Sequence, residues 1–152
     1  MYKPTLSEFA DRLNQVMPAI IKEFARRQAN ELYKGKITLP QFLVLEYLAR
    51  EGESHMTLLA HFMKVTTAAM TGIVDRLVRD GYLARTDDPQ DRRIIKVRVT
   101  TKGGDLVGRI NQQRRLMIIK IFGKIPETDR HDYLRILMQI KEILTKGNQD
   151  IK

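Results

Sequence analysis

Residues 65–101 read VTTAAMTGIVDRLVRDGYLARTDDPQDRRIIKVRVTT, and this stretch decides the fold. Thr66 is a suitable N-cap, because its side chain can accept a hydrogen bond from the first turn of a helix. Apolar residues then recur at helical spacing, at Met70, Ile73, Val74 and Leu77. Gly81 follows where a helix commonly ends in the left-handed conformation. The pattern predicts an amphipathic helix of about four turns with one buried face.

A charged hairpin is predicted directly after this helix. Residues 82–85 and 94–100 have the composition of strands, and in the second strand apolar and basic side chains alternate. The tip between them, residues 87–93, reads DDPQDRR and is too polar to be buried. A helix followed by such a hairpin can bind a nucleic-acid duplex, with the helix in one groove and the tip beside it.

The residues before this stretch predict two further helices. Thr38 and Gln41 have the spacing of a capping box at the start of a helix that ends at Gly52. Residues 55–56 predict a short strand, and Thr57 is the expected cap of a short helix that follows. A short helix, a turn and a second helix form the order of a helix-turn-helix.

Long amphipathic helices are predicted at both ends of the chain. The first extends from Thr5 or Ser7 to about Tyr33, another follows Thr100, and a last one begins at Pro126. Their apolar stripes are longer than one small core can cover. Two copies of the chain that pack these stripes together would bury the excess, so we expect a homodimer.

The fold class expected from these elements is mainly α with a small β-wing (α+β). Three segments are expected: an N-terminal dimerisation helix (1–36), a winged helix-turn-helix domain (37–100) and C-terminal dimerisation helices (101–152). Residues 37–100 contain the predicted helix-turn-helix and hairpin, and the flanking segments contain the long stripes.

Composition favours a polyanionic partner. The 152 residues include 27 Lys and Arg against 18 Asp and Glu, a formal net charge of +9, and 43% are hydrophobic, which is enough for a real core. The N-terminus lacks the pattern of a signal peptide, and no apolar run approaches 18 residues. We therefore expect a cytoplasmic protein that does not insert into a membrane.

Residue types exclude several kinds of site. The absence of cysteine excludes disulfides, thiolate zinc sites and thiol redox switches. The three histidines are isolated, so no metal site and no cofactor are expected. No nucleophile elbow, phosphate loop or catalytic dyad can be identified in the sequence, so neither catalytic residues nor an enzymatic activity are expected.

The element order and the residues at its joints resemble the MarR family of winged helix-turn-helix transcription regulators. The resemblance extends over nearly the whole chain. It rests on Val65-Thr66, Val74-Asp75-Arg76-Leu77, Gly81-Tyr82-Leu83-Ala84-Arg85, Asp91-Arg92-Arg93 and Val99-Thr100-Thr101-Lys102-Gly103.

The resemblance implies which residues meet DNA. The candidates are Thr66, Thr67, Ala68, Thr71, Gly72 and Arg76 on the helix, and Asp91, Arg92 and Arg93 on the wing. Arg93 would enter the minor groove, and Asp91 would hold the wing or orient that arginine. Many relatives have a large polar or basic residue at the position of Gly72, so DNA shape or water is expected to contribute to specificity. Asp75 would be repelled by DNA and is expected to pair with Arg76, Arg79 or a wing arginine.

The expected function is therefore that of a dimeric transcription regulator, most simply a repressor, that binds double-stranded DNA. Two helices would occupy successive major grooves of a pseudo-palindrome, about 34 Å apart. The resemblance also implies control by a small aromatic or anionic effector held between the dimerisation helices and the winged domain. The alternative is a winged-helix module for protein–protein interaction that does not bind DNA.

Overall fold

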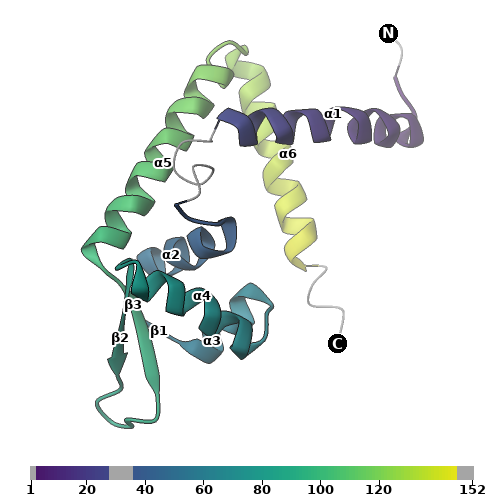
Figure 1. The fold of residues 1–152 in the computed structure, drawn as a ribbon. Coiled ribbons are helices and arrows are strands. Elements are labelled where there is room, and N and C mark those ends of the chain that lie inside the picture. The colour runs from purple at the N-terminus through teal and green to yellow at the C-terminus, as the bar shows by residue number, and fades with distance from the viewer. Residues whose placement is uncertain (1–2, 28–35, 147–152) are drawn as a thin grey trace. The chain divides into compact units, whose positions relative to one another are not determined.

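The computed structural model describes residues 3–27 and 36–146. The chain forms two compact units, Met1–Arg114 and Arg115–Lys152. Its elements, labelled in Figure 1, are α1 (Leu6–Arg27), α2 (Leu39–Glu51), β1 (Ser54–His55), α3 (Met56–Met63), α4 (Thr67–Arg79), β2 (Leu83–Asp87), β3 (Ile95–Val99), α5 (Thr101–Phe122) and α6 (Glu127–Lys146). The predicted fold class, mainly helical with a small β-wing, is confirmed.

The small sheet contains three antiparallel strands in the order β1-β3-β2. Ser54 pairs with Val97, and the β2–β3 ladder extends from the pair Leu83–Val99 to the pair Asp87–Ile95. The predicted first wing strand was therefore too short, because β2 reaches Asp87. Cross-strand pairing continues the ladder into residues that are too polar to suggest a strand by themselves.

The hydrophobic core lies between α2, α3, α4, the sheet and the first half of α5. The side chains of Phe42, Leu45, Met70, Val74 and Leu106 are 1% exposed or less. Each helix contributes one face, as the helical spacing predicts. This packing fixes the direction in which the opposite face of α4 points.

The helix starts follow the predicted caps at two of three places. Thr38 and Gln41 form the capping box of α2, and the Thr66 hydroxyl oxygen accepts a hydrogen bond from the Ala69 amide at 3.1 Å. The prediction for Thr57 was wrong, because α3 begins at Met56 and His55 occupies the cap without a side-chain bond. His55 is still paired in β1, so the chain passes directly from the strand into the helix.

One junction joins the end of α4, the base of the hairpin and the start of α5. Gly81 has φ +81° and ends the turn after α4. Its carbonyl accepts a hydrogen bond from the Thr100 hydroxyl at 2.6 Å. A Cβ built at Gly103 would lie 2.2 Å from the carbonyl oxygen of Tyr82. Lys102 Nζ donates to the Asp80 carbonyl at 2.7 Å and lies 4.7 Å from the centre of the Tyr82 ring. Only glycine allows α5 to begin so close to the hairpin.

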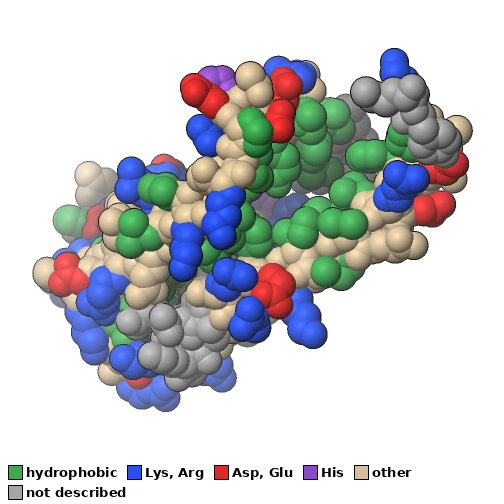
Figure 2. Space-filling model, turned by 90° about the horizontal axis from the view of Figure 1, so that it is seen from above, with side chains coloured by type: hydrophobic (Ala, Val, Ile, Leu, Met, Phe, Trp, Pro, Cys, Tyr) green, Lys and Arg blue, Asp and Glu red, His purple; other side chains and the backbone are tan. Residues whose placement is uncertain are grey.

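The outer helices keep their apolar stripes exposed. No residue of α1 or α6 is buried, and their exposed apolar side chains include Phe9, Leu13, Ile20, Leu137, Ile140 and Leu144. Figure 2 shows such side chains, in green, along α1. The expected continuation of the first helix to Tyr33 lies outside the described residues. Within the described parts, no single helix is long and apolar enough to cross a membrane; α3 and α4, bent by 107°, meet that criterion only as a pair.

Two glycines in α5 should respond oppositely to the addition of one methyl group. Gly103→Ala forces the Tyr82 carbonyl and the hairpin base apart, and overpacking of this kind costs about 1–3 kcal/mol or more. Gly108→Ala in the same helix meets nothing within 4 Å, so it should raise the free energy of unfolding by about 0.5–1 kcal/mol. Urea denaturation of both variants measures the difference. Equal effects would contradict the close packing at Gly103.

Candidate nucleic-acid interface

Helix α4 exposes one face, because its opposite face is anchored in the core. Met70, Val74 and Leu77 are buried. All six helix residues predicted to meet DNA are exposed: Thr66, Thr67, Ala68, Thr71, Gly72 and Arg76. The N-terminal half of α4 therefore presents a surface of small side chains, with one arginine in the turn that follows.

Two of the three threonine hydroxyls on this surface already make bonds inside the helix. The Thr66 hydroxyl oxygen accepts from the Ala69 amide, and the Thr71 hydroxyl donates to the Thr67 carbonyl at 2.9 Å. Bonds of a hydroxyl to the preceding turn are common for threonine in helices. This face consequently has fewer free hydrogen-bonding groups than its sequence suggests.

Gly72 lies in the middle of the exposed face. A Cβ built there meets nothing within 4 Å, so packing within this chain does not require glycine at this position. Glycine in the interior of a helix is destabilising relative to alanine. The exposed helix backbone is therefore not covered by a side chain at this position.

Asp75 connects α4 to the hairpin. Its carboxylate pairs with the Arg85 guanidinium of β2, and both side chains are partly exposed. Sequence reasoning expected Asp75 to pair with Arg76, Arg79 or a wing arginine, and the structure favours the last. The ion pair neutralises an acidic group beside the exposed face and links the helix to the hairpin.

Two aspartates shape the tip of the hairpin through backbone bonds. Asp88 Oδ1 accepts from the Gln90 amide at 2.8 Å, and Asp91 Oδ1 accepts from the Arg93 amide at 2.9 Å. The Asp91 carbonyl also accepts from the Ile94 amide at 2.9 Å. Such Asx turns hold a polar loop in one conformation. Asp91 thus fixes the backbone from which Arg93 projects.

A network of partly buried ion pairs at the edge of the sheet supports this tip. Lys96 Nζ lies 3.0 Å from Asp88 Oδ2 and 3.4 Å from Glu53 Oε1, and the Lys96 and Asp88 side chains are only 22% and 15% exposed. The Gln90 amide and then the Lys96 ammonium hold the pKa of Asp88 below its ordinary value. Asp88 in turn raises the pKa of Lys96. Sequence reasoning missed this network, although a lysine in the middle of a β-strand was a signal of an ion partner across the sheet.

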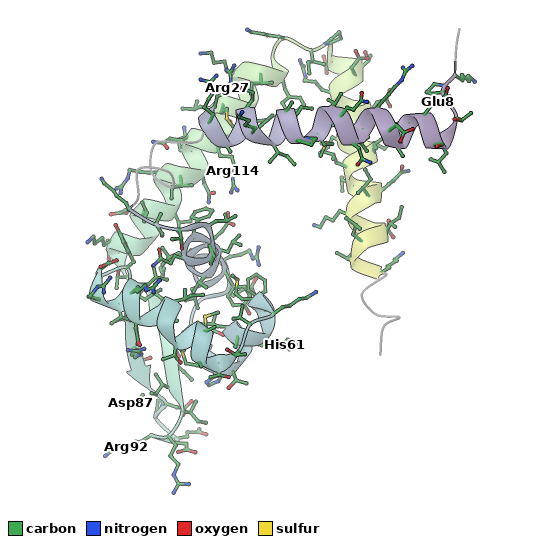
Figure 3. All side chains as sticks on the ribbon, turned by 45° about the vertical axis from the view of Figure 1, so that its right-hand side comes forward. Glu8, Arg27, His61, Asp87, Arg92 and Arg114 are labelled. Atoms are coloured by element: carbon green, nitrogen blue, oxygen red, sulfur yellow. The ribbon has the colours of Figure 1, made fainter. Side chains whose placement is uncertain are left out.

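Arg92 and Arg93 are exposed at the tip, and no described carboxylate forms an ion pair with either. Figure 3 shows Arg92 projecting from the end of the hairpin. Asp87, labelled in the same view, is also exposed, but it belongs to β2 and not to the tip turn. Two free guanidinium groups on a held turn are suited to a narrow, negatively charged groove.

The other basic residues of α5 are partly structural. Lys102 contacts the end of α4, and Arg114 Nη2 lies 2.8 Å from Glu46 Oε1 of α2. The Arg114 side chain is 39% exposed, and its ion pair with Glu46 joins α5 to α2. Within the described residues, no group of three or more His, Asp or Glu side chains could hold a metal ion.

The Asp88 carboxylate should make the tip sensitive to acid. Its folded-state pKa is lowered, so its contribution is fully present above the ordinary aspartate pKa and is lost as the pH falls through the lowered value. The protection factors of the Gln90 and Asp91 amides, measured by NMR and corrected for the intrinsic pH dependence of amide exchange, should therefore fall on acidification. Asp88→Asn should abolish this step. Asp87→Asn removes a neighbouring exposed carboxylate and should preserve it, and loss of the step in both variants would contradict the assignment to Asp88.

Comparison with known proteins identifies related chains. Residues 37–95 match the MarR family. The uncharacterized helix-turn-helix-type transcriptional regulator YkoM of Bacillus subtilis is 25% identical over 132 residues, which cover 87% of this chain and 85% of YkoM. The helix-turn-helix-type transcriptional repressor YetL of the same organism is 33% identical over 99 residues, 65% of this chain and 54% of YetL.

A solved structure shows the same architecture over almost the whole chain. The structure of RV1404 from Mycobacterium tuberculosis superposes with a TM-score of 0.80 and 27% identity, covering 93% of this chain and 96% of that one. The matched domain, the regulators among its relatives and the shared winged-helix architecture agree with the residues quoted from the sequence. Residues 37–95, which contain the helix-turn-helix and most of the hairpin, are therefore similar to the MarR family, and the relatives YkoM and YetL are named as transcriptional regulators.

Proposed function

We propose that this chain is a repressor that binds a pseudo-palindromic DNA operator as a homodimer. The observation that carries the proposal is the exposed N-terminal half of α4, joined by the Asp75–Arg85 ion pair to a hairpin whose tip arginines, Arg92 and Arg93, have no ion-pair partner among the described carboxylates. In this proposal α4 enters the major groove and the wing enters the adjacent minor groove. The name of the related repressor YetL supports repression as the direction of control.

The positive charge of the chain supports a polyanionic partner. The formal net charge is +9, and Thr66, Thr67, Ala68, Thr71, Gly72 and Arg76 would line the major groove. Arg76 is long enough to reach a phosphate or a base edge beyond the small residues that precede it. Arg92 and Arg93 would supply the minor-groove contact, with Asp91 holding their turn. Phosphate contacts would give affinity, and groove contacts would give specificity.

The exposed stripes of α1 and α6 support dimerisation through segments 1–36 and 101–152. Phe9 and Ile20 of α1 are 51% and 43% exposed, and Leu137 and Leu144 of α6 are 41% and 66% exposed. Apolar surface of this extent is unusual on a monomer. In the proposed dimer a two-fold axis relates two copies of α4, so that they meet half-sites one helical turn apart.

A cavity beside Arg114 supports control by a small anion. The cavity has a volume of about 80 Å³ and is lined by Arg27, Leu39, Phe42, Leu43, Ile110, Gln113 and Arg114. Arg27 and Arg114 are labelled in Figure 3. Arg114 lies 5.8 Å from the centre of the Phe42 ring and is paired with Glu46. An aromatic carboxylate would compete with Glu46 for Arg114, and binding would loosen the contact between α2 and α5.

The DNA-binding proposal is tested with Arg93→Ala. Loss of a minor-groove arginine should weaken binding to an operator, selected from a random DNA pool with the full chain, by about 1–3 kcal/mol and reduce the salt slope by about 1. Fluorescence anisotropy at several salt concentrations measures both, and sedimentation checks that the dimer persists. Arg50→Ala, which removes the same charge from an exposed position of α2 outside the proposed DNA contacts and dimerisation segments, is the matched control.

Unchanged affinity in Arg93→Ala would overturn the wing assignment. A chain that binds no DNA at low salt would favour a protein–protein interaction module. The selected sequences also test the dimer, because a two-fold operator must contain inverted half-sites.

The effector proposal is tested with benzoate as the probe. Benzoate should raise the thermal midpoint of the free protein and weaken operator binding, and Arg114→Met should abolish both effects. Glu46→Gln keeps Arg114 but removes the competing carboxylate, so benzoate should bind this variant more tightly than the natural chain. Calorimetric titration measures the affinities. An unaltered benzoate response in Arg114→Met would exclude this cavity.

A further inference from the structure

We propose that the first two turns of α4 recognise the C5-methyl groups of thymine, through the methyl groups of Ala68 and Thr71. The inference rests on the proposed binding of DNA and names the bases that α4 reads. The half-site beneath these two turns would then consist of A·T pairs whose thymine methyls face Ala68 and Thr71. The contact would be apolar, with few direct hydrogen bonds to base edges.

The first argument is the shortage of hydrogen-bond donors on this face. In residues 67–73 the only side-chain donors are the hydroxyls of Thr67 and Thr71. The Thr71 hydroxyl hydrogen is used, because it donates to the Thr67 carbonyl at 2.9 Å. Guanine is normally read by arginine or lysine, and adenine by asparagine or glutamine. Neither type occurs in these two turns.

The second argument concerns acceptors. An acidic side chain near the groove could accept a hydrogen bond from the N4 amino group of cytosine. Asp75 is the one acidic residue of α4, and it is engaged by Arg85 of β2. The same ion pair directs the carboxylate toward the hairpin. Cytosine recognition by this residue is therefore disfavoured, and thymine remains the base whose major-groove edge offers an apolar group.

The third argument is the direction of the Thr71 side chain. Its hydroxyl is held against the backbone of the preceding turn, and this bond selects one χ1 rotamer for a residue with few rotamers. With the oxygen held on the backbone, the methyl group of Thr71 is the part left to meet a partner. Ala68 is exposed and adds a methyl group one turn away on the same helix.

The fourth argument is the space at Gly72. The built Cβ meets nothing within 4 Å, so the chain carries a glycine where a larger side chain would fit. Gly72 is four residues after Ala68, and residues at this spacing are neighbours on one helix face. A side chain at Gly72 would hold the helix away from the base edges. Its absence lets the short methyl groups reach them, which contact with a thymine methyl requires.

The experiment compares thymine with uracil, which differs only by the methyl group and keeps the same base pair. The probe is the operator duplex obtained by selection from a random pool with the full chain. Each thymine of a half-site is replaced in turn by deoxyuridine, and anisotropy at fixed salt gives the affinity. Burial of one methyl group contributes about 0.8 kcal/mol, so we expect about a fourfold loss at each contacted thymine. Replacement in both half-sites should give about a 16-fold loss, because the two sites contribute independently.

Two variants of Thr71 separate its methyl group from its hydroxyl. Thr71→Ser keeps the hydroxyl bond to the Thr67 carbonyl and removes the methyl group, so discrimination between thymine and uracil should disappear at one position of each half-site. Thr71→Val keeps a methyl group at that place and should retain the discrimination, whatever happens to the total affinity. Circular dichroism of both variants confirms that the helix is intact.

Equal binding of the thymine and uracil duplexes at every position would overturn the inference. So would a selected half-site without thymine, or full discrimination in Thr71→Ser. These outcomes leave the proposed function standing, since the operator would still be bound. Failure of the chain to bind any DNA would overturn the proposed function and the inference together.

Discussion

The close contact of Gly103 with the Tyr82 carbonyl is the constraint on which the DNA-facing part of the molecule depends. It brings the start of α5 against the base of the hairpin, and the Thr100 hydroxyl and the Lys102 ammonium bind the last carbonyls after α4. The end of α4, the hairpin and the start of α5 are therefore held together by the same set of contacts. A displacement of the start of α5 must move these contacts as well, because a close-packed interior transmits strain.

A second link joins the two elements proposed to bind DNA. The Asp75–Arg85 ion pair connects the middle of α4 to β2, on the side opposite the packed core. Both partners are partly exposed, so the pair adds little to global stability. Its effect is on orientation, because it directs a carboxylate away from the exposed face. The result is an α4 surface of methyl groups and one arginine, beside a tip with two more.

The basic side chains differ in whether they are held by a partner within the chain. Lys96, Lys102 and Arg114 are held by Asp88, by the Asp80 carbonyl and by Glu46 respectively. Arg92 and Arg93, by contrast, have no described carboxylate partner within ion-pair distance. A net charge of +9 predicts a polyanionic partner in general terms, but it does not tell which cations are free to bind it. Which lysines and arginines are free depends on which acidic groups the fold brings near each basic side chain.

The sequence by itself determined the elements, because helical spacing, capping residues and glycine stops act over a few neighbours. The capping box at Thr38, the cap at Thr66 and the end of α4 at Gly81 were all predictable in this way. The cap of α3 was not, since strand pairing of His55 replaced the local preference for Thr57. Only the tertiary structure decided the partner of Asp75, the network around Lys96 and the role of Arg114. These contacts join residues 8 to 68 positions apart, and packing of the core, not local spacing, sets which of them meet.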